Sequence, residues 1–316
     1  MMTHEQFDVF TVYKLESASS FLYVDCSDAT VFMEGLADYI LSETNLLNYA
    51  NTLTPIEFKA TPYIYKKLYM TLSSFLNAEM ELLTFDNVTQ EIRDVLDNEY
   101  TFVNSAGELL IQKDKIGKIG EYTFHLLLTN YFKLHCIIPK FRCTTDRNMS
   151  VFGIDTLYLN PATHTIYFGE SKVSKNLDNA IKLVNRSLQD YEEQISEEYK
   201  LVLSNDEAFH LSAEFIEIFK EHTDVCISFS EFIKAANIDN ICIPIFLAHG
   251  NDKSSNKIED FLHQMNQRIK KRDFFGLNTS YLLISLPIID KTKMMNVLMR
   301  KVVKKHNEYE SQRNAL

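Results

Sequence analysis

The segment IYFGESKVSK, residues 166–175, begins with apolar residues and then carries Glu170 and Lys172. Side chains at positions i and i+2 of a β-strand point to the same face. A strand through this segment therefore places the carboxylate and the ammonium side by side, with Ser171 on the other face. Such a pair is commonly a surface ion pair that contributes little to stability, so other residues must indicate whether it does chemistry.

A second carboxylate precedes this pair on a segment that we predict to be the neighbouring strand. Asp155 lies in GIDTLYLN, and the turn-forming sequence NPATH at 160–164 separates it from the segment with Glu170. Two short apolar segments joined by such a turn are typical of a β-hairpin. Directly opposed side chains of antiparallel strands lie about 5 Å apart. We therefore expect Asp155 to approach Glu170, with Lys172 beside them.

Two carboxylates and a lysine at one edge of a sheet are suited to phosphodiester hydrolysis. Hard divalent cations such as Mg²⁺ bind carboxylate oxygens and keep several water molecules. A lysine beside them can orient the attacking water and stabilise the charge that develops on a phosphate. The set Asp155, Glu170 and Lys172 therefore indicates a metal-dependent hydrolytic site.

Glu121 follows Gly120 early in IGKIGEYTFHLLLTNYF, residues 116–132, which we predict to be a strongly apolar helix. The glycine would let the helix approach the sheet closely, and Glu121 could then supply a further metal contact. The helix dipole alone also favours an acidic residue in the first turn, so both interpretations of Glu121 stay open. We interpret His125 on the same helix as a packed residue rather than a ligand.

The elements that must position these residues indicate an α/β domain with a mixed sheet. From about residue 111 their order is helix, three strands and helix, followed by strand, helix, strand and helix. One apolar stripe predicts a single helix of five turns through Leu177, Ile181, Val184, Leu188, Tyr191 and Ile195. The later predicted elements are a strand at 241–250, a helix at about 256–272, a strand at 280–287 and a helix from Asp290.

Residues 1–110 carry no recognisable chemistry, and we predict an accessory or docking region there. A strand pair is predicted at 7–17 and 19–27, followed by a helix that Asp28 caps. Residues 111–316 form the predicted catalytic domain.

Composition restricts the class of protein. The 316 residues are 46% hydrophobic and 24% charged, as in ordinary folded proteins. No apolar run is long enough to span a membrane, and no signal peptide is visible, so we expect a cytoplasmic protein without a membrane partner. The five cysteines are scattered singly, which indicates reduced thiols rather than a zinc site.

The net charge of −11 argues against a free-standing nucleic-acid binder. Bound cations would offset part of the charge at a carboxylate site. Basic tracts at 268–272 and 291–305 support a nucleic-acid partner only weakly, because such tracts are commonly solvated helix faces.

The ordered set of Gly120-Glu121 on a helix, Asp155 on a strand, Glu170-Ser171-Lys172 on the next strand and a following helix resembles the PD-(D/E)xK nuclease core. The resemblance implies a restriction-endonuclease-like α-β-β-β-α-β core, with a mixed central sheet flanked by helices and an N-terminal α/β extension. It implies that Asp155 and Glu170 bind Mg²⁺ or Mn²⁺, that Lys172 positions the water, and that Glu121 assists. Ile154 departs from the proline of the motif name.

The stretch at 151–191 is similar to the nuclease-like HamA family of the Hachiman anti-phage defence system, and the similarity extends over about 110–310. It implies a DNA endonuclease effector that works with HamB, a superfamily 2 helicase. The helicase would restrain the nuclease until phage-associated DNA damage releases it. Two alternatives stay open: a catalytically inactive nuclease fold that serves as a regulatory or binding subunit of a helicase complex, and a type II-like restriction enzyme that acts alone.

Overall fold

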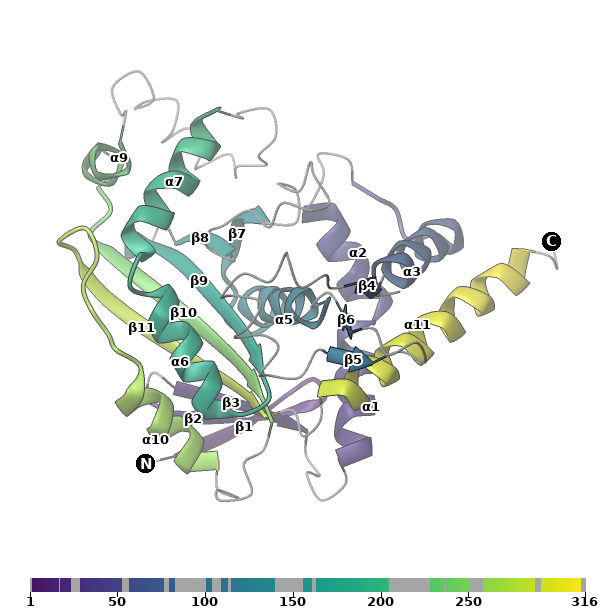
Figure 1. Ribbon diagram of the computed structural model, residues 1–316. Coiled ribbons are helices and arrows are strands. Elements are labelled where there is room, and N and C mark those ends of the chain that lie inside the picture. Colours follow the sequence, from purple (N-terminus) through teal and green to yellow (C-terminus); the bar gives the residue numbers. More distant parts are fainter. Residues whose placement is uncertain are drawn as a thin grey trace.

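The computed structural model describes residues 2–16, 18–23, 29–52, 57–76, 80–82, 101–103, 109–112, 115–139, 156–160, 163–204, 228–235, 237–250, 258–287 and 291–313. One eight-stranded sheet dominates the structure, with the strand order β1-β2-β3-β11-β10-β9-β8-β7 (Figure 1). Its strands are β1 (Thr3–Phe7), β2 (Phe10–Leu15), β3 (Ala18–Tyr23), β7 (His135–Pro139), β8 (Thr156–Asn160), β9 (Thr165–Ser174), β10 (Asn240–His249) and β11 (Asn278–Pro287).

The sheet is mixed, as predicted. Strands β9, β10, β11 and β3 run parallel to one another, whereas the remaining neighbours pair antiparallel. The helices are α1 (Ala29–Ile40), α2 (Glu43–Thr52), α3 (Pro62–Leu76), α5 (Lys115–Leu126), α6 (Leu177–Ser187), α7 (Tyr191–Ser204), α9 (Phe229–Ala235), α10 (Ile258–Arg268) and α11 (Lys291–Arg313). The predicted order of helix, three strands and helix, then strand, helix, strand and helix, is present, but two additional helices, α7 and α9, lie between α6 and β10. Among the helices in the described ranges, none is long and apolar enough to cross a membrane.

Helices cover both faces of the sheet and form two hydrophobic cores. The first core lies between the sheet and α6, α7, α9 and α10, and includes Phe168 and Ile245. The second lies between the sheet and α1, α5 and α11, and includes Phe124 and Phe246. Strand β10 is buried along almost its whole length, as expected of a parallel strand that is covered on both sides.

Strand β10 contains a proline at its centre, although proline lacks the N–H that a central strand needs. Pairing between β9 and β10 stops after Cys242 opposite Tyr167 and resumes at Ile245 opposite Glu170. Pro244 lies in this interval. The ladder is therefore interrupted immediately before Glu170.

Helix α5 packs unusually close to β9, and Gly120 makes this possible. A Cβ atom at Gly120 would lie 2.3 Å from Cγ2 of Val173 and 3.5 Å from Oγ of Ser171. The predicted role of this glycine in a close helix–sheet approach is confirmed. The helix continues into a π-helical turn, η2 (Leu127–Tyr131), before β7.

The single helix predicted through Leu177 and Ile195 is wrong. The chain forms two helices, α6 and α7, with a turn between them at residues 188–190. All six apolar positions of the predicted stripe are nevertheless buried. The turn thus changes the direction of the chain while the same apolar side chains stay in the first core. The predicted helix at 256–272 also ends earlier, at Arg268.

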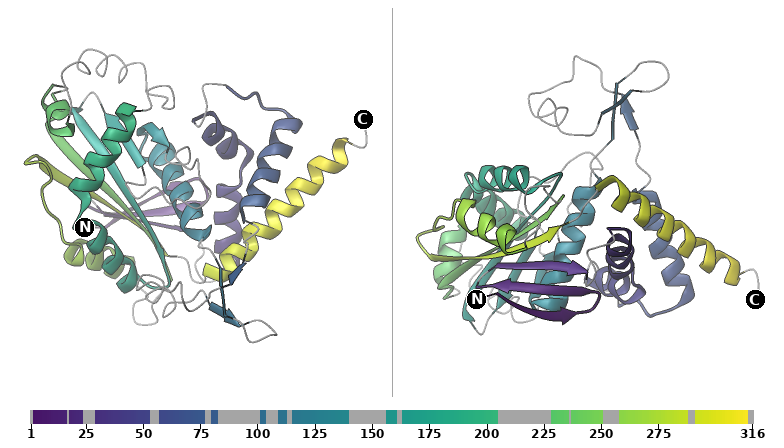
Figure 2. Two further views of the ribbon diagram at one scale, coloured as in Figure 1. Left: turned by 45° about the horizontal axis from the view of Figure 1, so that its top comes forward. Right: turned by 90° about the horizontal axis from the view of Figure 1, so that it is seen from below.

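The N-terminal strand pair and the helix after residue 28 are confirmed by β2, β3 and α1. Strand β3 pairs with β11, so the N-terminal strands extend the central sheet. A second, three-stranded sheet contains β4 (Met80–Leu82), β5 (Thr101–Val103) and β6 (Leu109–Gln112) and lies apart from the central sheet (Figure 2). The accessory or docking role of residues 1–110 stays a prediction.

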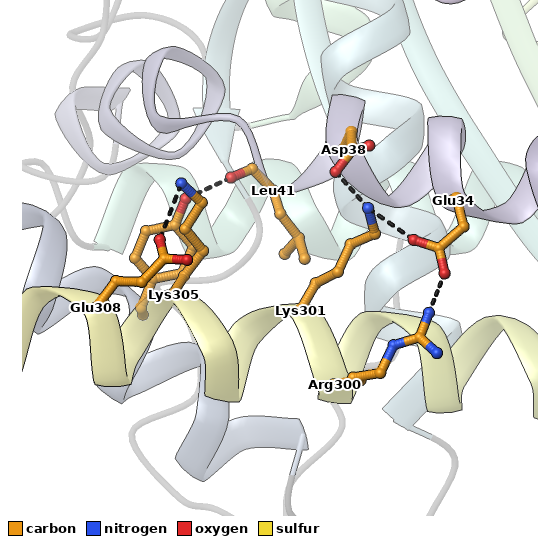
Figure 3. A network of polar contacts seen from close by, with 8 residues as sticks. Glu34, Asp38, Leu41, Arg300, Lys301, Lys305 and Glu308 are labelled. Atoms are coloured by element: carbon orange, nitrogen blue, oxygen red, sulfur yellow. Dashed lines mark hydrogen bonds and ion pairs between the residues drawn. The ribbon is translucent and has the colours of Figure 1, made fainter.

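Helix α11 is held against α1 by ion pairs (Figure 3), and a further ion pair joins it to α2. Arg300 and Lys301 both bind Glu34, and the Lys301 ammonium also lies 2.5 Å from Asp38. Lys305 lies 3.7 Å from the carboxylate of Glu43 on α2. Much of the basic tract at 291–305 therefore neutralises acidic residues of the same chain rather than facing a partner.

Replacing Gly120 by alanine should destabilise the protein by about 1–3 kcal/mol, because the new methyl group overlaps Val173 and forces α5 away from β9. Denaturant unfolding measures this loss. The double variant Gly120→Ala/Val173→Ala removes the overlap, so its loss should be smaller than the sum of the two single losses. Additive losses would contradict the close approach.

Candidate active site

Glu170 and Lys172 lie side by side on β9, as the sequence predicts. The Lys172 ammonium is 2.5 Å from Oε1 of Glu170. The Glu170 side chain is 3% exposed and the Lys172 side chain is 28% exposed. A buried carboxylate is costly to keep ionised unless a cation accompanies it, so this is not the surface ion pair of the simpler interpretation.

The pair faces the first core side of the sheet. Glu170 is opposite Ile245 and Lys172 is opposite Leu247 in the parallel ladder with β10, and both of these partners belong to the first core. Ser171 points to the second core side, against α5. The site thus lies near the carboxyl ends of parallel strands, where ligands commonly bind in α/β sheets.

The predicted hairpin before this pair is confirmed. Strands β8 and β9 are antiparallel, and Thr156 pairs with Gly169. Asp155, the residue before Thr156, lies outside the described residues. Its convergence with Glu170 stays a prediction.

Glu121 is a half-buried residue of α5. Helix α5 packs on the second core side, against Ser171 and Val173, whereas Glu170 and Lys172 lie on the first core side. Glu121 therefore comes from the opposite side of β9. Its assistance at the metal site stays a prediction. The position of α5 gives this role no advantage over a structural role.

The metal donors that the structure describes are few. Within the described ranges, no group of three or more His, Cys, Asp or Glu residues is arranged to hold a metal ion. Mg²⁺ commonly uses one or two carboxylates and keeps several waters, so Glu170 with a second carboxylate suits such an ion. The donor set is therefore compatible with the predicted metal, provided that Asp155 supplies that carboxylate.

Tyr191 supports the strand immediately before Glu170. Its hydroxyl donates a hydrogen bond of 3.1 Å to the carbonyl of Phe168, and its ring is fully buried. Pro244 has no N–H to donate to this carbonyl across the ladder, so the tyrosine takes the place of the missing backbone donor. The sequence placed Tyr191 in the core correctly. Pro244 within a buried strand was the signal in the sequence that a side chain such as the Tyr191 hydroxyl must supply a hydrogen bond there.

A second buried polar group, His249, was not predicted from the sequence. It lies on the same face of the sheet as Glu170 and Lys172, at the carboxyl ends of the strands. His249 is fully buried, and its Nε2 lies 2.8 Å from the hydroxyl of Ser285. Its Nδ1 lies 2.8 Å from the carbonyl of Gly250 and must donate to it, so Nε2 accepts from Ser285. Burial lowers the pKa of His249 to about 4. The imidazole is therefore neutral and holds β10 to β11.

His125 is a packed residue, as predicted. It is buried on α5, and its Nδ1 lies 2.9 Å from the hydroxyl of Tyr158 on β8. Burial lowers the pKa of His125 to about 4. Cys242, a described cysteine, is likewise a buried free thiol.

A family model for HamA matches residues 29–302 of the 316-residue chain. The chain belongs to the HamA family. This family is part of the Hachiman anti-phage defence. The match begins at α1 and ends within α11. It therefore includes helices on both faces of the central sheet of this HamA-family chain. Comparisons with curated proteins and with solved structures give no match.

The two buried histidines of this HamA-family chain should make its stability depend on pH. Each has a pKa near 6.5 when unfolded and about 4 when folded, so the unfolded state binds more protons between these values. The unfolding free energy should therefore fall as the pH drops from about 6.5 to 4, by about 1.4 kcal/mol per pKa unit for each histidine. Denaturant unfolding across this range measures the effect.

The variant His249→Gln should be less stable at neutral pH but should lose less further stability on acidification. His263→Gln, which changes an exposed histidine of α10, is the control and should keep the parental profile. Parallel profiles for His249→Gln and the parent would show that the buried imidazole does not titrate in this way.

Proposed function

We propose that the chain is a metal-dependent DNA endonuclease with a PD-(D/E)xK core. The observation that carries the proposal is the buried Glu170 carboxylate paired with Lys172 near the carboxyl end of β9. The element order α5, β7, β8, β9, α6 and β10, with α7 and α9 inserted before β10, supports it, since that core is expected to have helix, three strands, helix and strand in this order.

Asp155 is the proposed second metal ligand. If the β8–β9 ladder continues by one residue beyond Thr156 and Gly169, Asp155 is opposite Glu170. Paired residues of neighbouring strands share a face, so both carboxylates would then lie on the side that carries Lys172. Glu121 is retained as an assisting residue in this proposal.

The chemistry divides between the ion and the chain. A bound Mg²⁺ or Mn²⁺ would supply Lewis-acid stabilisation of the negative charge on the scissile phosphate. The Lys172 ammonium would orient the attacking water and stabilise the same charge as it develops. Burial of Glu170 favours this arrangement, because charges interact more strongly where water is largely excluded.

The proposed context is a complex with a superfamily 2 helicase, HamB, that delivers DNA and restrains cleavage. Membership in the HamA family supports this context. The net charge of −11 also supports it, because an acidic chain gains little from long-range attraction to a polyanion. A partner that holds the DNA would compensate for this repulsion.

Glu170→Gln should lower DNA cleavage by about 10²-fold or more, because it keeps the size of the side chain but removes a charge that holds the metal. Lys172→Ala should lower cleavage similarly. Plasmid cleavage with Mg²⁺, with and without the helicase, measures both. Lys172→Ala also leaves a buried carboxylate without this cation, which costs between about 1 kcal/mol for an exposed pair and 3–5 kcal/mol for a buried one.

Circular dichroism at the assay temperature should therefore be measured for each variant. Lys172→Arg keeps a cation beside Glu170, so comparing it with Lys172→Ala separates loss of charge from loss of fold. Glu193→Gln, on the exposed side of α7, is the matched control and should cleave normally. If folded Glu170→Gln and Lys172→Ala proteins retain full cleavage and phage defence, the carboxylate–lysine pair is not catalytic. The regulatory-subunit alternative would then replace the nuclease.

The isolated chain should bind DNA weakly, and its affinity should fall steeply with salt because binding depends on a small number of phosphate contacts. Fluorescence anisotropy from about 50 to 200 mM salt, with and without the helicase, measures this dependence. Tight, salt-resistant binding by the chain alone would remove the need for a partner that delivers DNA.

A further inference from the structure

The exposed side of α6 carries cations that begin beside the candidate site. Lys175, Lys182 and Arg186 are exposed and recur at helical spacing from the end of β9 to the end of α6. The acidic residue on this side, Asp178, forms an ion pair with Arg268 of α10. The helix therefore keeps a net positive side over its 11 residues, a length of about 16 Å.

The segment after α10 adds further cations and is fixed against α6. The Asn185 side chain donates to the Arg268 carbonyl at 3.0 Å and accepts from the Lys270 N–H at 2.8 Å. The Arg272 N–H donates to the Tyr281 hydroxyl at 2.9 Å, and this hydroxyl donates back to the Arg272 carbonyl at 2.7 Å. Both ends of the segment are thus held by side chains of the folded core.

Five exposed cations make up what we call the cationic track: Lys175, Lys182, Arg186, Lys270 and Arg272. We propose that the cationic track binds the phosphate backbone of DNA and leads it to the candidate site at Lys172. The proposal deepens the proposed function and rests on it for the identity of the polyanion.

Charge and geometry favour a nucleic-acid backbone. Duplex DNA carries one negative charge per about 1.7 Å of its axis, so a surface of about 16 Å faces several phosphates at once. Cations on a helix and on an anchored segment are already positioned, so binding orders little of the chain. Exposed acidic residues, Asp190 and Asp273, follow α6 and Arg272 in the chain, so the cationic track does not continue along the chain beyond them.

The basic residues of α11 do not compete for this role. That helix packs on the second core side of the sheet, whereas α6 covers the first. Arg300, Lys301 and Lys305 are in ion pairs with α1 and α2. The excess of cations next to the candidate site is therefore local, in spite of the acidic net charge.

The test compares Lys182→Ala/Arg186→Ala with Lys67→Ala/Lys304→Ala, a control that removes two exposed cations from α3 and α11. All proteins carry Glu170→Gln and are assayed without divalent metal on a short fluorescent duplex and its single strand. The track variant should bind about tenfold more weakly and should reduce the slope of log affinity against log salt by about 2, since each lost duplex contact removes about 0.9. The control should match the parent.

An unchanged slope in the track variant, an equal loss in the control, or no binding by the parent at about 50 mM salt would overturn the proposal. Equally strong binding of poly-glutamate would also overturn it, since the surface would then fit an acidic polypeptide. Asn185→Ala removes no charge but releases the segment after α10, and it should also weaken binding.

Cleavage has no part in this measurement. If the slope changes as expected but the protein without Glu170→Gln never cleaves DNA, the cationic track is supported and the nuclease proposal fails. If that protein cleaves DNA but the slope does not change, the nuclease proposal is supported and the cationic track fails.

Discussion

An ionised carboxylate inside a protein needs a cation within a few ångströms, and Glu170 has one in Lys172. This requirement explains much of the surrounding structure. The two residues must share one face of β9, so the strand cannot change its register by one residue without exchanging the two faces. The opposite face is therefore left to small or apolar side chains, which lets α5 lie directly on Ser171 and Val173 through Gly120.

The sequence was sufficient for those parts of the structure that follow from local patterns. The alternation around Glu170 predicted a strand, and the turn residues before Thr165 predicted the β8–β9 hairpin. The apolar character of 241–250 predicted a buried strand. Each of these patterns depends on residues close together in the chain, where periodicity and turn chemistry act directly.

The features that the sequence did not reveal depend on packing between distant segments. The stripe from Leu177 to Ile195 has helical spacing throughout, yet the chain turns after Ser187 because a short turn keeps the same side chains in the core. Nothing local to Glu121 specifies which side of β9 its helix covers. The depth at which Glu170 is buried is likewise a property of the assembled sheet and not of the motif.

The distribution of charge has two separate origins in this fold. Three cations of α11, namely Arg300, Lys301 and Lys305, neutralise acidic residues of α1 and α2, and Figure 3 shows the pairs with α1. The cations of α6 lie on the other side of the sheet, where Asp178 of the same helix is paired with Arg268 of α10. Net charge therefore describes the chain poorly, since three cations of α11 are paired within the chain whereas the cations of the cationic track are exposed.

Pro244 and Tyr191 are far apart in the sequence, but both affect the carbonyl of Phe168, because the proline cannot donate to it and the tyrosine hydroxyl does. Any other residue at position 244 would restore a backbone donor and make the tyrosine hydroxyl redundant. Loss of the tyrosine while the proline is kept would instead leave a buried carbonyl with one donor fewer beside Glu170. The two residues should therefore be inherited as a pair, and a relative that has lost one of them is expected to have lost the other.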